Sequence, residues 1–164
     1  MWAENGVEPP LRAHMEAVAD TAMNLIGYDL SLVRGDLLDT AYDFQGTSIN
    51  VRLLYFAALL HDVARATGMS FHAENGAAYL KKQGYLEIAE LVKPHHDAAV
   101  WKENEPLSEA EILYYADKLV QGDRLVTLRE RFERSRDKCK TEEAVKNHEL
   151  RYQAALGIER KMGI

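Results

Sequence analysis

The sequence lacks the features that mark secreted and membrane proteins. Its 164 residues include one cysteine, Cys139, which cannot form a disulfide within the chain, and this agrees with the reducing conditions of the cytoplasm. No apolar run is long enough to span a lipid bilayer. Residues 1–20 carry acids and two prolines in place of the basic and then apolar layout of a signal peptide. We therefore expect a cytoplasmic protein with no membrane as a partner.

An excess of positive charge is also lacking. The formal net charge is −6 and the pI is near 5.5, a balance that argues against long nucleic acid as a partner. A small nucleotide stays compatible with it, because a metal ion or local positive charge can outweigh the overall sign.

Helical patterning is what the chain has in abundance. Hydrophobic residues make up 47% of the sequence, and their spacing is helical nearly everywhere, with no convincing strand or repeat. We expect a first helix from Pro9-Pro10 onward and a second over 32–44. After a loop at 45–48, with Ser48 as the cap, helices should follow over 50–66, 71–84 and 85–92. The capping box of Ser108 and Glu111 should begin a helix that runs to about 122, and two more should lie within 124–161. No break in composition marks a second domain. We predict an all-α fold, a compact single-domain helical bundle over residues 1–164.

The pair His61-Asp62 stands where the apolar helical segment 53–60 ends. A carboxylate and an imidazole at the edge of a hydrophobic core are unfavourable unless a partner compensates for the lost hydration. A bound metal ion would be such a partner. The dipeptide alone is weak evidence, because His96-Asp97 is a second example in the same chain. Its meaning depends on the other candidate ligands.

Those candidates are histidines and an acid in suitable settings: His14, His72, His95, His96 and Asp117. Each has an ordinary alternative explanation, such as a core histidine bonded to a carbonyl group, an exposed histidine, a solvated turn, or a salt bridge from Asp117 to Lys118. Together they point to a metal-dependent hydrolase built on helices. Imidazole and carboxylate ligands suit iron, manganese, nickel, cobalt or zinc. His148 lies in a charged C-terminal stretch, and we expect it at the surface.

Three segments carry a resemblance to a known family: AALLHDVAR (57–65), HAENGAAYL (72–80) and YYADKL (114–119). With His14 before them and His95 between the last two, they resemble the HD-domain metal-dependent phosphohydrolase superfamily. The chain is most similar to small bacterial HD hydrolases with a two-metal site, among them diadenosine tetraphosphate hydrolases. The motif-bearing core covers about 8–124, and the C-terminal helices cover about 124–161. The stretch after His96 lacks the Gly-Tyr-Pro signature of cyclic-di-GMP phosphodiesterases.

This resemblance implies a set of ligands. His14, His61, Asp62 and Asp117 would hold one metal ion, and Asp62 would bridge to a second ion held by His72 and His95. His96 would either support these ligands or replace His95. One or two divalent or trivalent ions are implied, with iron expected first and manganese, nickel, cobalt, zinc or magnesium as alternatives.

The resemblance also implies a reaction. Asp62 and His61 would be catalytic, and metal-activated water would cleave a phosphate ester or anhydride of a small nucleotide-like substrate. Arg65 and Lys118 would neutralise substrate phosphate, with a structural salt bridge as the alternative for each. The competing functions are an HD-type di-iron oxygenase and a metal-binding regulatory module without catalysis. A homodimer is a further expectation.

Overall fold

The computed structural model describes residues 1–29, 31, 41–67 and 71–164. A short 3-10 turn, η1 (Ala3–Asn5), precedes the long first helix α1 (Pro9–Leu25). As predicted, prolines occupy the first turn of α1, where their missing N–H groups leave no hydrogen bond unmade. The inward face of α1 buries His14, Val18 and Ala22.

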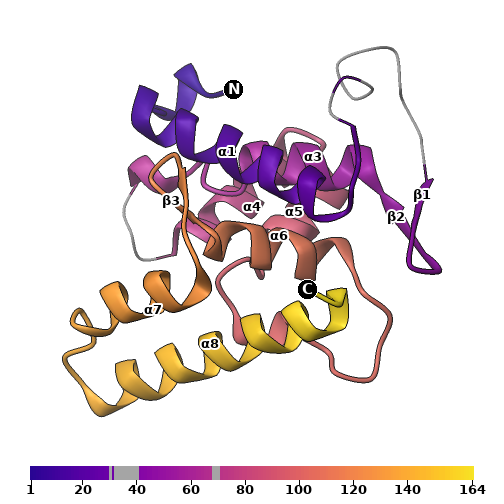
Figure 1. Cartoon of the computed structure of the whole chain (residues 1–164). Helices are drawn as coiled ribbons and strands as arrows, with labels where there is room; N and C mark the ends of the chain where they lie inside the picture. The colour runs from indigo at the N-terminus through magenta and orange to yellow at the C-terminus, as the bar shows by residue number, and fades with distance from the viewer. Residues whose placement is uncertain (30, 32–40, 68–70) are drawn as a thin grey trace.

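Helix α3 (Val51–Leu60) lies beside α1 (Figure 1). Its N-terminus is capped by Asn50, whose side chain accepts a hydrogen bond from the Leu53 N–H. Residues of α3 pack against α1, α5 and α6, so the end of this helix is enclosed by other elements. The chain then continues through turns into the 3-10 segment η2 (Arg65–Thr67).

Helices α4 (His72–Lys82) and α5 (Leu86–Val92) pack against each other. An added Cβ at Gly76 would lie 3.6 Å from a Val63 methyl and 3.7 Å from a Val92 methyl, which are ordinary van der Waals distances, so an alanine would also fit there. A turn after α5 leads into the 3-10 segment η3 (Ala98–Val100). The histidines 95 and 96 lie in that turn.

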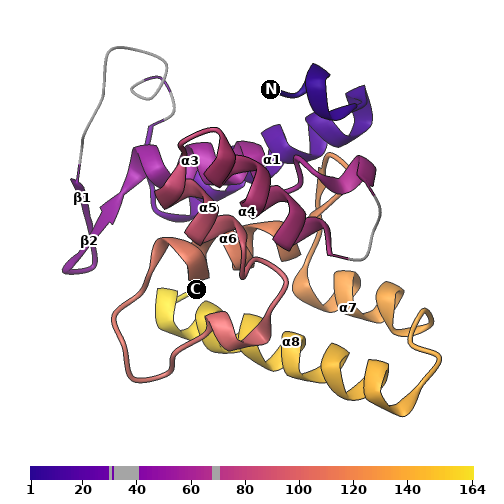
Figure 2. The same cartoon turned by 180° about the vertical axis from the view of Figure 1, so that it is seen from behind.

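Helix α6 (Glu109–Lys118) begins with the capping box that the sequence predicts between Ser108 and Glu111. It is followed by a small hairpin of β3 (Val120–Gln121) and β4 (Arg124–Leu125). Helices α7 (Leu128–Arg136) and α8 (Glu142–Met162) then pack against each other, and α8 also packs on α6 and η3 (Figure 2).

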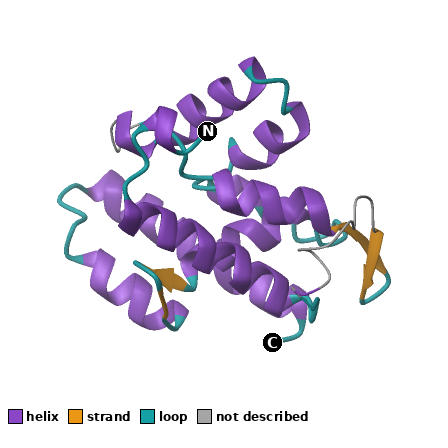
Figure 3. Cartoon of the chain, turned by 90° about the horizontal axis from the view of Figure 1, so that it is seen from above, coloured by secondary structure: helices purple, strands orange, loops and turns teal. Residues whose placement is uncertain are grey.

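A second hairpin pairs β1 (Ala41–Phe44) with β2 (Thr47–Asn50) at the edge of the molecule (Figure 3). Its antiparallel register places Phe44 opposite Thr47. The turn between them uses Gln45 and Gly46 with φ of 53° and 80°, the left-handed backbone that two-residue hairpin turns require.

The helical bundle that the sequence predicts is therefore confirmed, with local corrections. The predicted helix over 32–44 is wrong at 41–44, which form β1, and 32–40 lie outside the described residues. Ser48 is a strand residue, so it does not cap α3. Helix α3 ends at Leu60 because the Val63 N–H bonds to the Leu60 carbonyl, a tighter turn than the α-helix makes. No helix in the described parts of the chain is long and apolar enough to cross a membrane.

Candidate metal centre

His61 and Asp62 lie just beyond the end of α3 and are almost completely buried, with exposed fractions of 0% and 1%. The His61 Nδ1–H donates to the Ala58 carbonyl oxygen at 2.8 Å. A carbonyl oxygen can only accept, so this bond fixes the proton on Nδ1. The lone pair of Nε2 is then left for another partner.

The same arrangement recurs at two other histidines. His14 Nδ1 donates to the Gly122 carbonyl oxygen at 2.7 Å, and His95 Nδ1 donates to the Val92 carbonyl oxygen at 2.6 Å. Metal-binding histidines are usually held in this way by a hydrogen bond at the other ring nitrogen. Gly122, in the turn between β3 and β4, is a supporting residue that the sequence did not reveal, because a backbone carbonyl leaves no residue-type signal.

One cluster of potential ligands combines His14 from α1, His61 and Asp117 from α6. His14 Nε2 lies 3.3 Å and His61 Nε2 lies 3.7 Å from Asp117 Oδ1. The ligand atoms of the three residues all lie within 4.8 Å of one another, and all three side chains are buried. The cluster thus brings together residues from three separate helical regions.

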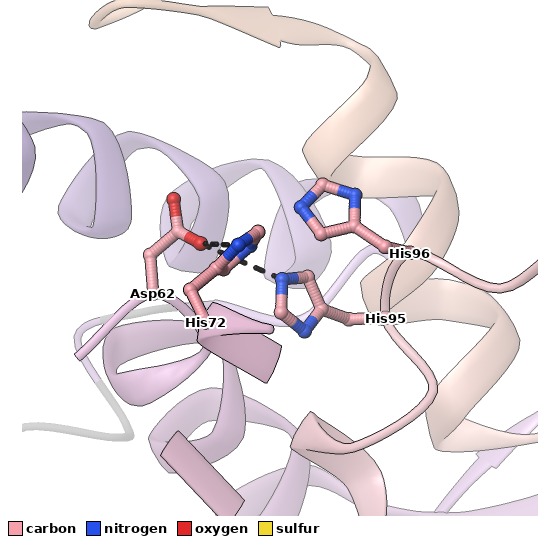
Figure 4. A group of neighbouring side chains, drawn as sticks. All are labelled: Asp62, His72, His95 and His96. Carbon is pink, nitrogen blue, oxygen red and sulfur yellow. Dashed lines mark ion pairs between the residues drawn. The ribbon is translucent and has the colours of Figure 1, made fainter. Parts of the chain in front are cut away.

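A second cluster combines Asp62, His72 at the start of α4, His95 and His96 (Figure 4). His72 Nε2 lies 3.2 Å and His95 Nε2 lies 3.5 Å from Asp62 Oδ1. The His96 ring centre lies 4.6 Å from that of His72 and 4.3 Å from that of His95. His96 is therefore near enough to belong to this group in addition to His95.

The carboxylate of Asp62 connects the two clusters. Its Oδ1 faces His72 and His95, whereas its Oδ2 lies 3.7 Å from His61 Nε2 and 3.9 Å from His14 Nε2. The two oxygens of one carboxylate thus point to two different groups of imidazoles. This is the geometry that the sequence resemblance implied for a bridging residue.

Comparison with known families agrees with this geometry. The family model described as HD domain matches residues 12–121, which include all the clustered side chains. The chain belongs to the HD-domain family. No curated protein and no solved structure gave a match.

HD domains bind divalent metal ions, and the side chains of this HD domain fit that use. Among the described residues, the buried atoms with no hydrogen-bond partner include Nε2 of His14, His61 and His95, and Oδ1 of Asp62. Leaving so many polar atoms unsatisfied in a protein interior is strongly unfavourable. They are all potential ligand atoms directed into the two clusters, so metal ions would satisfy them.

The electrostatics of the HD domain favour ionised acids. Burial opposes ionisation of Asp117, but the Lys118 ammonium and the imidazoles of His14 and His61 outweigh it and hold the pKa of Asp117 well below its usual range. Burial likewise opposes ionisation of Asp62, yet its neighbouring histidines, His61 foremost, lower its pKa. Both acids are therefore carboxylates, the form in which they bind metal.

The predicted phosphate ligands of this HD domain both form ion pairs. Arg65 Nη1 lies 2.6 Å from Asp62 Oδ2, and 36% of the Arg65 side chain is exposed. Lys118 is buried, with its Nζ 2.5 Å from Asp117 Oδ2 and 3.4 Å from the His95 carbonyl oxygen. Both residues thus make the salt bridges that the sequence left as alternatives, and their contact with phosphate stays a prediction.

The predicted surface position of His148 is wrong. His148 is 7% exposed, and its Nε2 lies 3.1 Å from the Phe132 carbonyl oxygen and 2.9 Å from Ser135 Oγ. It packs against the Phe132 ring between α7 and α8. The charged residues next to His148 in sequence lie on the other faces of α8, so the charge of this stretch wrongly predicts an exposed position for His148.

Proposed function

We propose that this HD domain is a phosphohydrolase with two metal ions, which cleaves a phosphate ester or anhydride of a small nucleotide-like substrate. The observation that carries the proposal is the shared carboxylate of Asp62, which faces two separate groups of imidazoles. A pair of neighbouring metal sites is typical of enzymes that transfer phosphoryl groups to water.

In this proposal, His14, His61 and Asp117 would hold one ion, and His72, His95 and His96 would hold the other, with Asp62 between the two groups. Metal ions held there would lower the pKa of bound water to near neutral and stabilise negative charge on phosphoryl oxygens. We expect iron first, with manganese, nickel, cobalt, zinc or magnesium as alternatives.

The chain's own residues would orient and charge the site. The carbonyl groups of Ala58, Val92 and Gly122 hold the imidazoles in the tautomer that presents Nε2. Arg65 is the more accessible of the two cations. Because a metal ion would take over the charge of Asp62, Arg65 is placed to pair with a substrate phosphate at the edge of the site.

Metal analysis tests the bridging assignment. The Asp62→Ala variant should retain less than a tenth of the wild-type metal at both sites, because it removes the shared carboxylate. The control is Asp97→Ala, which alters the chain's other His-Asp dipeptide but leaves both clusters intact. Wild-type metal content in Asp62→Ala, measured by plasma mass spectrometry on the folded protein, would refute the bridge.

A screen of nucleotides and phosphate esters tests the reaction. Metal-dependent release of phosphate or nucleotide without dioxygen supports hydrolysis. Substrate loss that needs both iron and dioxygen would instead identify the di-iron oxygenase. Bound metal without turnover of any compound would favour the regulatory module. A cytoplasmic location, a homodimer, and the absence of membrane and long nucleic-acid partners stay predictions.

A further inference from the structure

A cleft of about 1180 Å³ opens beside the second cluster of ligands. Its lining includes the ligand candidates His72 and His96 and, from α8, the residues Asn147, Leu150 and Arg151. Pockets of this size accept small-molecule substrates. The cleft therefore offers a route to the metal centre, and one of its walls comes from the C-terminal helix.

Helix α8 lies outside residues 12–121, the part of the chain that the HD-domain family describes. It is nevertheless held firmly against the helix that carries Asp117. The Tyr114 hydroxyl donates to the Arg151 carbonyl oxygen at 2.9 Å, and Lys161 Nζ lies 2.6 Å from a Glu111 carboxylate oxygen. The backbone at Arg151 is thus positioned relative to α6 and to the metal centre.

Some charged side chains of the cleft already have partners among the described residues and others do not. Three acids line the cleft: Glu74, Glu90, which pairs with Lys81 at 2.6 Å, and Asp97, which accepts a hydrogen bond from the Ala99 N–H at 2.8 Å. Its cations Lys93 and Arg151 have no carboxylate within ion-pair distance among the residues that the structure describes. Two cations that make no ion pair in the described part of the chain thus share the cleft with three acids, two of which are already engaged.

Most N–H donors of the Arg151 guanidinium make no hydrogen bond within the described part of the chain. Its Nε donates to the Asn147 carbonyl oxygen at 3.1 Å, which fixes the direction of the side chain along α8. A guanidinium carries five N–H donors, and in the described part of the chain this is the one hydrogen bond that the Arg151 guanidinium makes. A planar, oriented fork of free donors is suited to a carboxylate or phosphate.

We propose that α8 forms the far wall of the substrate cleft and that Arg151, assisted by Lys93, binds a second anionic group of the substrate. This inference rests on the proposed function, in which a phosphoryl group occupies the metal centre. The substrate class is then a phosphate compound with a second, separate phosphate or carboxylate group. Arg151 is a specificity-determining residue and is not needed for the chemical step itself.

Binding of non-hydrolysable phosphonates to the metal-loaded protein tests this proposal. Alkylphosphonates present one anionic group, and ω-carboxyalkylphosphonates of the same chain length present two. We expect that, at the fitting length, the carboxylate improves the dissociation constant about tenfold, the equivalent of about 1.4 kcal/mol. Arg151→Gln should remove this preference and leave alkylphosphonate binding within about twofold, and Arg151→Lys should restore part of it.

The matched control is Arg160→Gln, which removes the same charge from an exposed residue of α8 that does not line the cleft. It should keep the full preference. The proposal is overturned if no chain length shows a preference in the wild type, if Arg151→Gln keeps it, or if Arg160→Gln loses it equally. If the protein shows the Arg151-dependent preference but hydrolyses no phosphate compound, the role of Arg151 in the cleft is supported and the proposed hydrolase function is refuted. If it hydrolyses a phosphate compound without that preference, the hydrolase function is supported and the role of Arg151 is refuted.

Discussion

The imidazoles of the metal centre differ in the protonation state that their surroundings favour. Burial opposes a charged His61, yet the carboxylates of Asp62 and Asp117 outweigh it and raise its pKa. Burial lowers the pKa of His95, and the nearby His61 adds to the effect, although Asp62 opposes it. Since a metal ligand must be a neutral imidazole, His95 is ready for metal at neutral pH, whereas His61 holds its proton more strongly until metal displaces it.

His96 should make the metal-free protein sensitive to acid. Burial, then the Lys118 ammonium and then the neighbouring His95 lower the pKa of His96 to about 2. The unfolded chain takes up a proton at His96 near pH 6.5, while the folded chain does not. The stability that comes from keeping His96 neutral is therefore fully present above about pH 6.5 and is lost as the pH falls below it, because protonation then favours the unfolded chain. Between about pH 6 and 4, His96→Asn should reduce the slope of the unfolding free energy against pH by about 1.4 kcal/mol per pH unit.

Urea unfolding of metal-stripped protein at a series of pH values measures this slope. The wild type and His96→Asn are compared under the same conditions, so the other histidines contribute equally to both. Parallel profiles would mean that the folded protein protonates His96, contrary to the expectation.

His148 should matter for stability and not for metal. Its Nε2 is hydrogen-bonded to the Phe132 carbonyl and is near Ser135 Oγ, and its ring fills the space between α7 and α8. His148→Ala should therefore lower the unfolding free energy by about 1–3 kcal/mol and leave metal content unchanged. Chemical denaturation measures the unfolding free energy and metal analysis measures the metal content, and substitution of an exposed neighbour, Lys146→Ala, is the control. Loss of metal in folded His148→Ala would contradict this separation.

The residues of the metal centre could be predicted because residue type limits ligand chemistry. The structure places every candidate from His14 to Asp117 in one of two clusters or between them. His148 was missed although its helical spacing with Ala155 and Ile158, both buried on α8, indicated an inward face. The charged residues beside it in sequence obscure this periodicity. The carbonyl partners of the imidazoles could not be predicted, since any residue supplies a carbonyl.

Among the secondary-structure elements, the long helices could be predicted and the short hairpins could not. Apolar periodicity and capping residues act within a helix, so α1, α6 and α8 follow from local sequence. The strands of β1 and β2 have four residues each, too few for a periodic signal. Distant contacts stabilise that hairpin instead, for example the Gln45 side chain, which donates to the Met162 carbonyl oxygen at 2.9 Å.

The hairpin of β3 and β4 should influence metal binding through its turn. Gly122 has a φ of 64°, and its carbonyl orients His14. Gly122→Val should shift this carbonyl and weaken metal binding about tenfold, the lower end of what loss of a supporting hydrogen bond causes. Gly84→Val is the matched control, because Gly84 also has a positive φ and open space around it but lies at the end of α4.

Both glycine variants should be destabilised by about 1–2 kcal/mol, since a branched side chain disfavours the left-handed backbone. The decisive comparison is the metal dissociation constant by competition with a chromophoric chelator. Equal metal affinity in the two variants would show that the turn does not position His14.

For the whole molecule, the metal centre is a meeting point of distant segments. Its side chains come from α1, the end of α3, the start of α4, the turn after α5, and α6. The order of the motifs indicated such a site, with Asp62 between two groups of ligands, through resemblance to HD domains, but the directions in which the two Asp62 oxygens point depend on how the helices pack. The wall that α8 contributes lies beyond the family match, so no motif could indicate it.

Metal removal should therefore loosen the whole bundle. Ions that bind the folded state alone add about 2.7 kcal/mol of stability at a hundredfold excess over the dissociation constant. For a chain of this size, 1 kcal/mol corresponds to about 2–4 °C, so chelation should lower the unfolding midpoint by about 5–10 °C and added metal should restore it. Asp62→Ala should show almost no such shift, while His148→Ala should show the full shift from a lower starting midpoint. Scanning calorimetry with and without chelator measures all three proteins, and an undiminished shift in Asp62→Ala would mean that the stabilising ions bind elsewhere.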